Sequence, residues 1–408
     1  MPSLEWIDTN KASIATRKLG QTLGLNPEGE VTLGWGADTD NAVELLCSLY
    51  RFSERLPSNI KYQFTRRAVI EAKKSNSLTL ADIAQRIDGK QGEYLRKPLQ
   101  RYDLLTNLSL RASSAIPGAR IEGAAISFSR HPPKKFKPQD YPSQRRTHYG
   151  RPPSDYAAAV VRIESRDPSS AGAQAIQTLD LLRGIWNFYV NYRRWRVSFG
   201  GGNAPFNSIL LGPIHLLFDA GGKPTDNVWW EPEYIEPRPT IDLSQRWGSL
   251  KKFEARVRHG LAVSPHRRLL RTSLLRYCRA LDERDHSTSF MKMWSLLEDL
   301  TATGNADHMT TVRRATFLSP DPEFHRLALD HLRRWRNRIV HEGESADEAE
   351  RMINEVKSYA EGLFLILLQH GHRFMTLAEF GNFLDSPVAL SDLRRRASHL
   401  QLALKFRG

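Results

Sequence analysis

The strongest constraint on the fold is a series of amphipathic segments in the C-terminal part of the chain. Apolar residues recur there at three- and four-residue spacing, so each segment presents one apolar stripe. The segments cover residues 265–282, 289–300, 311–317, 322–341 and 345–371, with two more at 376–384 and 390–404. Short connections between such helices favour antiparallel neighbours. We therefore expect an antiparallel helical bundle.

The fourth of these segments has well-marked ends. Asp321 is a capping residue and Pro322 suits the first helical position. Gly343 and a capping box that begins at Ser345 predict that the helix ends close to His341. The stripe expected to face the core consists of Phe324, Leu327, Ala328, Leu332, Trp335 and Ile339.

This helix also carries the candidate catalytic residues, Arg336, Asn337 and His341, with Arg338 beside them. Arginine presents a planar, charged fork that fits a phosphate, and histidine titrates near neutral pH and can transfer a proton. At about 100° per residue, a regular helix separates the side chains of Arg336 and His341 by about 140°. The alternative from the residues alone is an ion cluster that caps carbonyls at the helix end.

Two motifs resemble those of HEPN (higher eukaryote and prokaryote nucleotide-binding) domains. One is Arg336 followed by Asn337 and, five positions after the arginine, His341. The other, upstream, is the pattern W-x-x-L-E-x-L that begins at Trp294 and includes Glu298. The stretch from 268 to 371 is in this way similar to ApeA-like anti-phage HEPN ribonucleases.

The resemblance implies a metal-independent endoribonuclease of prokaryotic anti-phage defence, with no cofactor and no metal. It implies that the ribose 2′-hydroxyl attacks the phosphodiester and leaves a 2′,3′-cyclic phosphate. His341 would be the general base or would steady the hydroxyl, and Arg336 would neutralise charge on the phosphate. Asn337 would orient the pair or donate to a phosphate oxygen, Arg338 would add charge at the rim, and Glu298 would hold Arg336 or His341.

In the HEPN family two copies of the motif line one cleft, so the resemblance also implies a homodimer. Two other functions stay open. One is a non-catalytic HEPN module for dimerisation or nucleic-acid binding. The other is the HEPN toxin of a toxin-antitoxin pair, but those toxins have a tyrosine two positions after the histidine, where this chain has Gly343.

Charge favours a polyanionic partner, RNA above all, with tRNA one candidate. The formal net charge is +14 and the isoelectric point is near 9.8, which is typical of nucleic-acid-binding proteins. Residues 246–279 hold ten lysines and arginines against one acid, Glu254. We expect Arg267, Arg268 and Arg271 in this segment to contact RNA.

A second basic segment, at 130–153, is rich in proline and holds seven lysines and arginines against one acid, Asp140. Basic residues with interleaved aromatics can follow a single strand, which makes Lys134 and Lys135 candidate RNA contacts. The alternative is a solvent-exposed loop whose prolines prevent regular structure.

The whole chain is expected to be mainly helical with an α+β fold. We expect a mainly helical region at 1–110, a mixed α/β region at 111–245 and the HEPN-like bundle with its extension at 246–408. The first two regions would sense a phage-derived trigger or bind a regulatory partner. The sequence has no long apolar run and no signal-peptide pattern, and two cysteines give no disulfide framework. These features predict a cytoplasmic protein without membrane contact.

Overall fold

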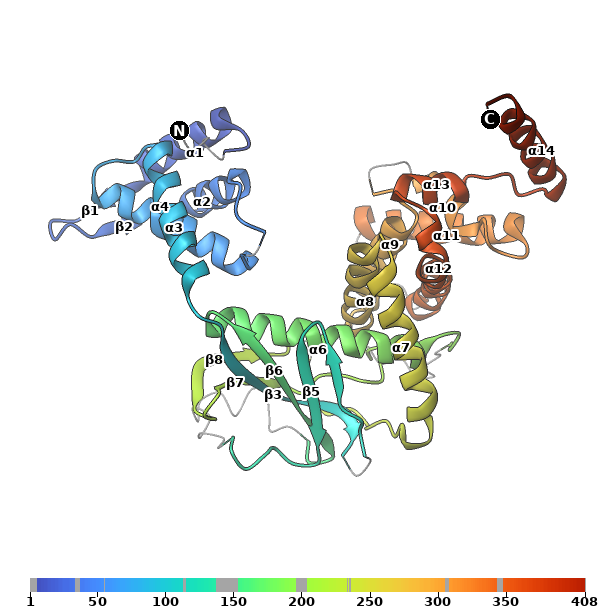
Figure 1. Cartoon of the computed structure of the whole chain (residues 1–408), viewed down its shortest axis with the longest axis horizontal. Coiled ribbons are helices and arrows are strands. Elements are labelled where there is room, and N and C mark those ends of the chain that lie inside the picture. Colours follow the sequence, from blue (N-terminus) through green and yellow to red (C-terminus); the bar gives the residue numbers. More distant parts are fainter. Residues whose placement is uncertain are drawn as a thin grey trace. The chain divides into compact units, whose positions relative to one another are not determined.

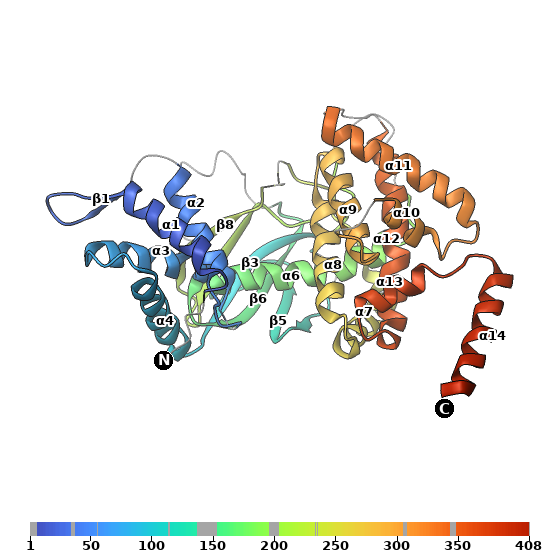
Figure 2. The same cartoon turned by 90° about the horizontal axis from the view of Figure 1, so that it is seen from above.

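The computed structural model confirms a mainly helical α+β fold (Figures 1 and 2). It describes residues 6–33, 37–54, 56–112, 115–136, 153–195, 204–232, 234, 236–304, 308–342 and 348–407. For Leu33 and for residues 340–342, the backbone alone is described. Two compact units divide the chain: one contains residues 1–102 and 163–174, and the other contains 103–162 and 175–408.

The first unit is a small helical domain. Its helices are α1 (Thr9–Thr22), α2 (Ala37–Leu49), α3 (Ser58–Lys74) and α4 (Leu80–Arg96), and a hairpin of β1 (Leu23–Leu25) and β2 (Val31–Leu33) follows α1. Asp8 and Thr79 cap α1 and α4 through their side chains, as their residue types favour. Apolar residues from all four helices form one core, including Leu19, Leu46 and Ile83.

The second unit begins with an antiparallel-rich sheet. Its strands are β3 (Gln100–Arg111), β4 (Ala119–Ile121), β5 (Ala124–Ser129), β6 (Tyr156–Ser165), β7 (Ile214–Asp219) and β8 (Pro224–Trp230), in the order β4-β5-β6-β3-β7-β8. Strands β4 and β5 form a hairpin, because Glu122 and Gly123 both take positive φ angles and turn the chain.

Helix α6 (Pro168–Asn191) runs along the sheet (Figure 1). Its second half is buried almost all round, with Leu182, Ile185 and Trp186 fully covered. Such a helix must pack against partners on more than one side. The Trp186 indole donates to Glu254 of α7 (Trp247–Val263) at 3.0 Å, which joins α6 to the helical bundle.

The bundle follows the expected order of helices. After a 3₁₀ turn at Ser244–Arg246 come α7, α8 (Arg267–Asp282), α9 (His286–Leu300), α10 (His308–Thr316), α11 (Pro322–Glu342), α12 (Ala349–His370), a 3₁₀ turn at Gly371–Arg373, α13 (Leu377–Leu384) and α14 (Leu390–Arg407). Helix α14 buries none of its residues and stands beside the bundle (Figure 2).

The stripe predicted for α11 was wrong in its N-terminal half. Phe324 and Leu327 are 62% and 70% exposed, whereas Leu329, Leu332 and Trp335 are buried. The core contact of α11 is narrow and centres on Trp335, whose ring meets the edge of Phe290 of α9 at 4.4 Å between centroids. The apolar stripe of α11 that faces the core is therefore rotated around the helix axis by part of a turn, relative to the predicted stripe.

The three predicted regions do not coincide with the two compact units. The first predicted boundary, at 110/111, falls at the end of β3, which belongs to the sheet from residue 103 onward. The predicted boundary at 245/246 does not divide the structure either, because the sheet region and the bundle form one unit. A buried set of charged residues, described next, explains why they belong together.

Arg183 is fully buried and connects α6 to α8 and to the loop before β7. Its guanidinium donates to Asp282 at 2.8 and 2.9 Å, to Asp180 at 2.6 Å and to the Ile209 carbonyl at 3.0 Å. Asn207 also donates to Asp282, at 2.8 Å. Because a buried charge is tolerated only when it is paired and hydrogen-bonded, these groups fix the relative positions of the elements that carry them.

Further buried charged residues link α8 to the sheet. Arg279 of α8 contacts Asp180 at 2.6 Å and Glu231, just after β8, at 2.9 and 3.0 Å. His215 of β7 lies 3.6 Å from Glu231 and hydrogen-bonds Thr106 of β3 at 2.7 Å. Burial raises the pKa of Glu231, but His215 and Arg279 outweigh it and hold the pKa at about 2. The ionised carboxylate therefore stabilises the fold.

Close packing of α6 on α8 can be tested with two helical glycines. A Cβ at Gly184 would lie 2.7 Å from the Leu274 carbonyl oxygen, whereas a Cβ at Gly362 would have no neighbour within 4 Å. Gly184→Ala should therefore lower the free energy of unfolding by about 1–3 kcal/mol. Gly362→Ala should raise it by up to about 1 kcal/mol, because alanine is the better helix former. Urea denaturation measures both, and equal effects would contradict the close contact.

The ion pair of Glu231 predicts a pH-dependent stability. The folded-state pKa of about 2 lies below the ordinary value of 4.5, so the carboxylate stabilises the fold above pH 4.5 and loses this effect as the pH falls toward 2. At neutral pH, Glu231→Gln should lower the free energy of unfolding by roughly 3 kcal/mol. Denaturation at about pH 7 and about pH 3 should show this gap narrowing in acid.

The matched control is Glu236→Gln, since the side chain of Glu236 is 58% exposed in its ion pair with Arg238. An exposed pair contributes at most about 1 kcal/mol, so this variant should differ little from the wild type at either pH. A gap for Glu231→Gln that stays constant between the two pH values would contradict the ion-pair assignment.

Candidate functional site

The predicted catalytic residues lie in the last two turns of α11, which ends at Glu342. Arg336 and Asn337 are half-buried, and the Arg336 Nη1 donates to the Asn337 Oδ1 at 3.3 Å. The structure therefore brings these two predicted site residues together, and Asn337 accepts a hydrogen bond from the guanidinium. Arg338, next along, is exposed.

Arg336 differs from its neighbours in what its guanidinium contacts. Arg333 and Arg334 both bind the Asp330 carboxylate, at 2.7 and 3.0 Å. Within the described part of the chain, no carboxylate pairs with Arg336, and its Nε is buried without a hydrogen-bond acceptor. A buried guanidinium N–H without an acceptor is costly, so this nitrogen is a ready donor for an oxygen anion.

His341 stands in the same helix as Arg336. Its backbone belongs to α11, and its side chain lies outside the described residues, as do Gly343 and Ser345. The helix ends one residue after His341, close to where the sequence predicts. Because residues 336–342 are all helical, the Cβ bonds of Arg336 and His341 diverge by about 140° around the axis.

Glu298, predicted to hold Arg336 or His341, contacts other residues within the described part of the chain. Its Oε1 accepts from the Trp294 indole at 2.8 Å and lies 2.9 Å from the His308 Nδ1. No hydrogen bond or ion pair joins Glu298 to Arg336 within the described residues. The W-x-x-L-E-x-L pattern thus has a local purpose here, since its first and fifth residues, one helical turn apart, bind each other.

The face of α11 that carries Arg336 also lines a pocket against α12. This pocket holds about 340 Å³ and is lined by His325, Phe324, Tyr359 and Trp195 among others. The His325 Nδ1 and the Tyr359 hydroxyl lie 2.8 Å apart, and burial raises the pKa of Tyr359 to about 12. His325 precedes Arg336 by eleven residues, so the two share one helix face to within about 20° and lie about 16 Å apart along the axis.

Sequence reasoning missed His308, His325 and the pocket. The partners in these contacts come from neighbouring helices, and no fixed spacing relates residues on two helices until their packing is known. No signal in the sequence indicated the pocket. Phe324 was predicted to be buried, and the structure shows it exposed at the pocket rim.

The basic residues predicted to bind RNA fall into two classes. Arg267, Arg268 and Lys134 are exposed, and no acid pairs with their side chains within the described residues. In contrast, Arg271 binds Glu122 through its Nη2 at 2.8 Å, and Lys135 binds the fully buried Asp103 at 2.6 Å. Arg271 and Lys135 therefore already have acidic partners within the fold, and their contact with RNA stays a prediction.

For two other predicted features, the described residues give no link to the α11 site. No hydrogen bond or ion pair of the described residues links Arg267 or Arg268 to Arg336. Most of the proline-rich basic segment, at residues 137–152, lies outside the described part.

Searches of protein-family profiles, curated proteins and solved structures find no match to this chain. Across the residues that the structure describes, no cluster of three or more histidine, cysteine, aspartate or glutamate side chains could hold a metal ion. In the same residues, no helix combines the length and the apolar character needed to cross a membrane. The case for a function therefore depends on the side chains themselves.

The pairing of Arg271 leads to a test with a matched neighbour on α8. Arg268→Ala should weaken binding of a short single-stranded RNA and reduce the salt slope by about 0.7, the value for one lost phosphate contact. Arg271→Ala should change the slope less, because Glu122 already neutralises that charge. Filter binding at several salt concentrations measures both slopes. A larger effect from Arg271→Ala would contradict this division of roles.

Proposed function

We propose that this protein is a metal-independent endoribonuclease of the HEPN type that acts in prokaryotic anti-phage defence. Arg336 and His341 would carry the reaction in a cleft between two copies of the chain. The bundle fold and the strongly basic composition agree with this proposal, and the observation that carries it is the state of Arg336.

Arg336 is prepared to receive an anion. Its Nε is buried without an acceptor, and no described carboxylate competes for the guanidinium. A phosphodiester supplies two non-bridging oxygens that can accept from such a fork. The neighbouring Arg333 and Arg334 lack this property, because Asp330 already binds them both.

The helical geometry gives a physical reason for a dimer. Because positions 336 and 341 lie about 140° apart around the axis of a regular helix, a single α11 would not present both at one phosphate. Two copies of α11 that meet with their ends side by side would combine the arginine of one copy with the histidine of the other. The homodimer implied by the HEPN resemblance satisfies this requirement.

The proposed reaction is an internal transfer at phosphorus. The 2′-hydroxyl oxygen bonds to phosphorus, and its proton passes to His341 as general base. Arg336 stabilises the extra negative charge on the pentacovalent phosphate, and Asn337 keeps the guanidinium in place through its 3.3 Å contact. The bond from phosphorus to the 5′-oxygen breaks, and this oxygen takes up a proton from the protonated histidine as it leaves. The products are a 2′,3′-cyclic phosphate and a 5′-hydroxyl.

RNA cleavage in EDTA tests the proposal. Wild-type protein should cut total cellular RNA or a tRNA pool and leave cyclic-phosphate ends. Arg336→Ala and His341→Ala should each lower the rate by about 10²-fold or more, since each removes a group acting in the transition state. Arg334→Ala is the matched control. It removes an exposed arginine of the same helix, bound to Asp330, and should retain activity.

Equal cleavage by the wild type and both variants would overturn the assignment of Arg336 and His341. RNA binding without turnover, unchanged in His341→Ala, would instead favour the non-catalytic HEPN module. Analytical ultracentrifugation of the same preparations tests the dimer, and a monomer that cleaves at full rate would exclude the shared cleft.

A further inference from the structure

A second cavity, away from the α11 site, lies where the end of α6 meets α12 and the loops around residues 204–210 and 238–242. It holds about 540 Å³, within the usual range for small-molecule sites. Its charged lining residues are Arg194, Arg238, Lys357 and Asp242. Among the residues that the structure describes, three cations and one carboxylate therefore line the cavity.

Lys357 of α12 is a buried cation at the cavity wall. Its side chain is 3% exposed, and its Nζ donates to the Asn191 carbonyl at 2.9 Å and to Glu361 at 3.0 Å. An ammonium group has three N–H donors. Two are used within the described part of the chain, which leaves the third for a ligand in the cavity that Lys357 lines.

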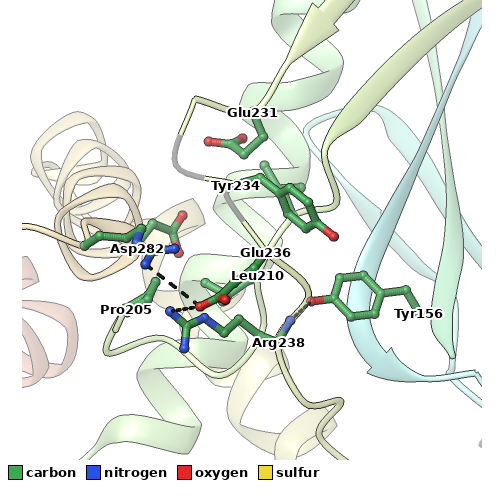
Figure 3. A pocket seen from close by; sticks show the side chains of 10 residues that line it. Tyr156, Pro205, Leu210, Glu231, Tyr234, Glu236, Arg238 and Asp282 are labelled. Carbon is green, nitrogen blue, oxygen red and sulfur yellow. Dashed lines mark hydrogen bonds and ion pairs between the residues drawn. The ribbon is translucent and has the colours of Figure 1, made fainter. Parts of the chain in front are cut away.

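Arg238 offers an unused donor from the opposite side. Its backbone N–H donates to the hydroxyl of the buried Tyr156 at 2.9 Å, and its Nη2 contacts Glu236 at 3.1 Å (Figure 3). Its Nε is buried and has no acceptor within the described residues. The anchored backbone keeps the side chain between a small neighbouring cavity and the large one, both of which it lines.

Arg194 is the third cation that lines the cavity. Asp242 does not neutralise these cations, because it binds other groups. The Arg194 Nη1 lies 3.5 Å from the Ser208 hydroxyl, and no carboxylate among the described residues pairs with it. Asp242 accepts from Arg111 at 3.1 Å and from the Ser244 backbone at 2.9 Å. Among the described lining residues, cationic side chains thus outnumber carboxylates, which suits an anion with several oxygens.

The rest of the lining is partly polar and partly apolar. Its apolar part includes Phe206, Leu210, Pro239 and Ile241, beside amide and hydroxyl side chains such as Asn191 and Thr240. Inorganic phosphate would leave this surface uncovered, whereas an organic group would cover it. We propose that this cavity binds a small phosphate-bearing organic molecule of nucleotide size. Arg194, Arg238 and Lys357 hold the phosphate oxygens, and the apolar walls contact the organic part.

The test uses full-length protein, the four nucleoside 5′-monophosphates and the four 5′-diphosphates, and isothermal titration calorimetry. At least one of them should bind with a dissociation constant below about 1 mM and raise the melting temperature. Arg238→Gln and Arg194→Glu should each weaken this binding by roughly tenfold or more, because each removes a charge-assisted contact. Circular dichroism of the ligand-free variants establishes that they are folded.

The control is Arg193→Asn. Arg193 does not line the cavity and has a positive φ of 56°, which asparagine tolerates. This variant removes the charge next to Arg194 and should bind like the wild type. A loss equal to that of Arg194→Glu would show that net charge alone attracts the ligand, and would overturn the site.

Three further outcomes overturn the proposal: no binding by any nucleotide, binding that neither cavity variant weakens, and equal affinity for inorganic phosphate. A short RNA oligonucleotide is the last probe. RNA binding that depends on Arg194 and Arg238, with no binding of free nucleotides, would make the cavity part of an RNA-binding surface instead. RNA cleavage in EDTA is measured separately on the same variants, so the two proposals stand or fall independently.

Discussion

The second compact unit depends on one buried cation, Arg183. This side chain is fully covered, and it binds carboxylates on α6 and α8 as well as the Ile209 carbonyl. A hydrophobic contact tolerates small rotations, whereas a buried guanidinium requires its acceptors in fixed directions. Removing one partner of such a pair costs about 3–5 kcal/mol. The sheet and the helices that carry the candidate sites are therefore held in one arrangement.

Hydrophobic spacing predicted the helices well and the buried charges not at all. The segments at 265–282 and 289–300 correspond closely to α8 and α9, because each helix has one wide apolar face and a clear start. In the sequence, Arg183 and Asp282 look like ordinary surface charges, since nothing local distinguishes a buried ion from a solvated one. Phe324 and Leu327 show the opposite error, because helical spacing alone does not say which apolar face finds a partner.

The candidate sites follow the same rule: the sequence indicates contacts between neighbouring residues, but not contacts between residues from separate segments. Arg336 and Asn337 are adjacent in the chain, and their contact follows directly from the motif. Glu298 was assigned across helices, and the structure instead gives it His308 and Trp294. The cavity around Lys357 unites residues from four separate segments, so no spacing in the sequence could have indicated it.

Helix α14 is held by no buried side chain of its own. It buries none of its residues, although Leu400, Leu404 and Phe406 are all more than half exposed on it. An isolated helix of this length is only marginally stable in water, whereas α6 and α8 open only when their buried charges separate. Amide hydrogen exchange in the free protein would therefore differ widely along the chain: within seconds over α14, and on the timescale of global unfolding around Arg183.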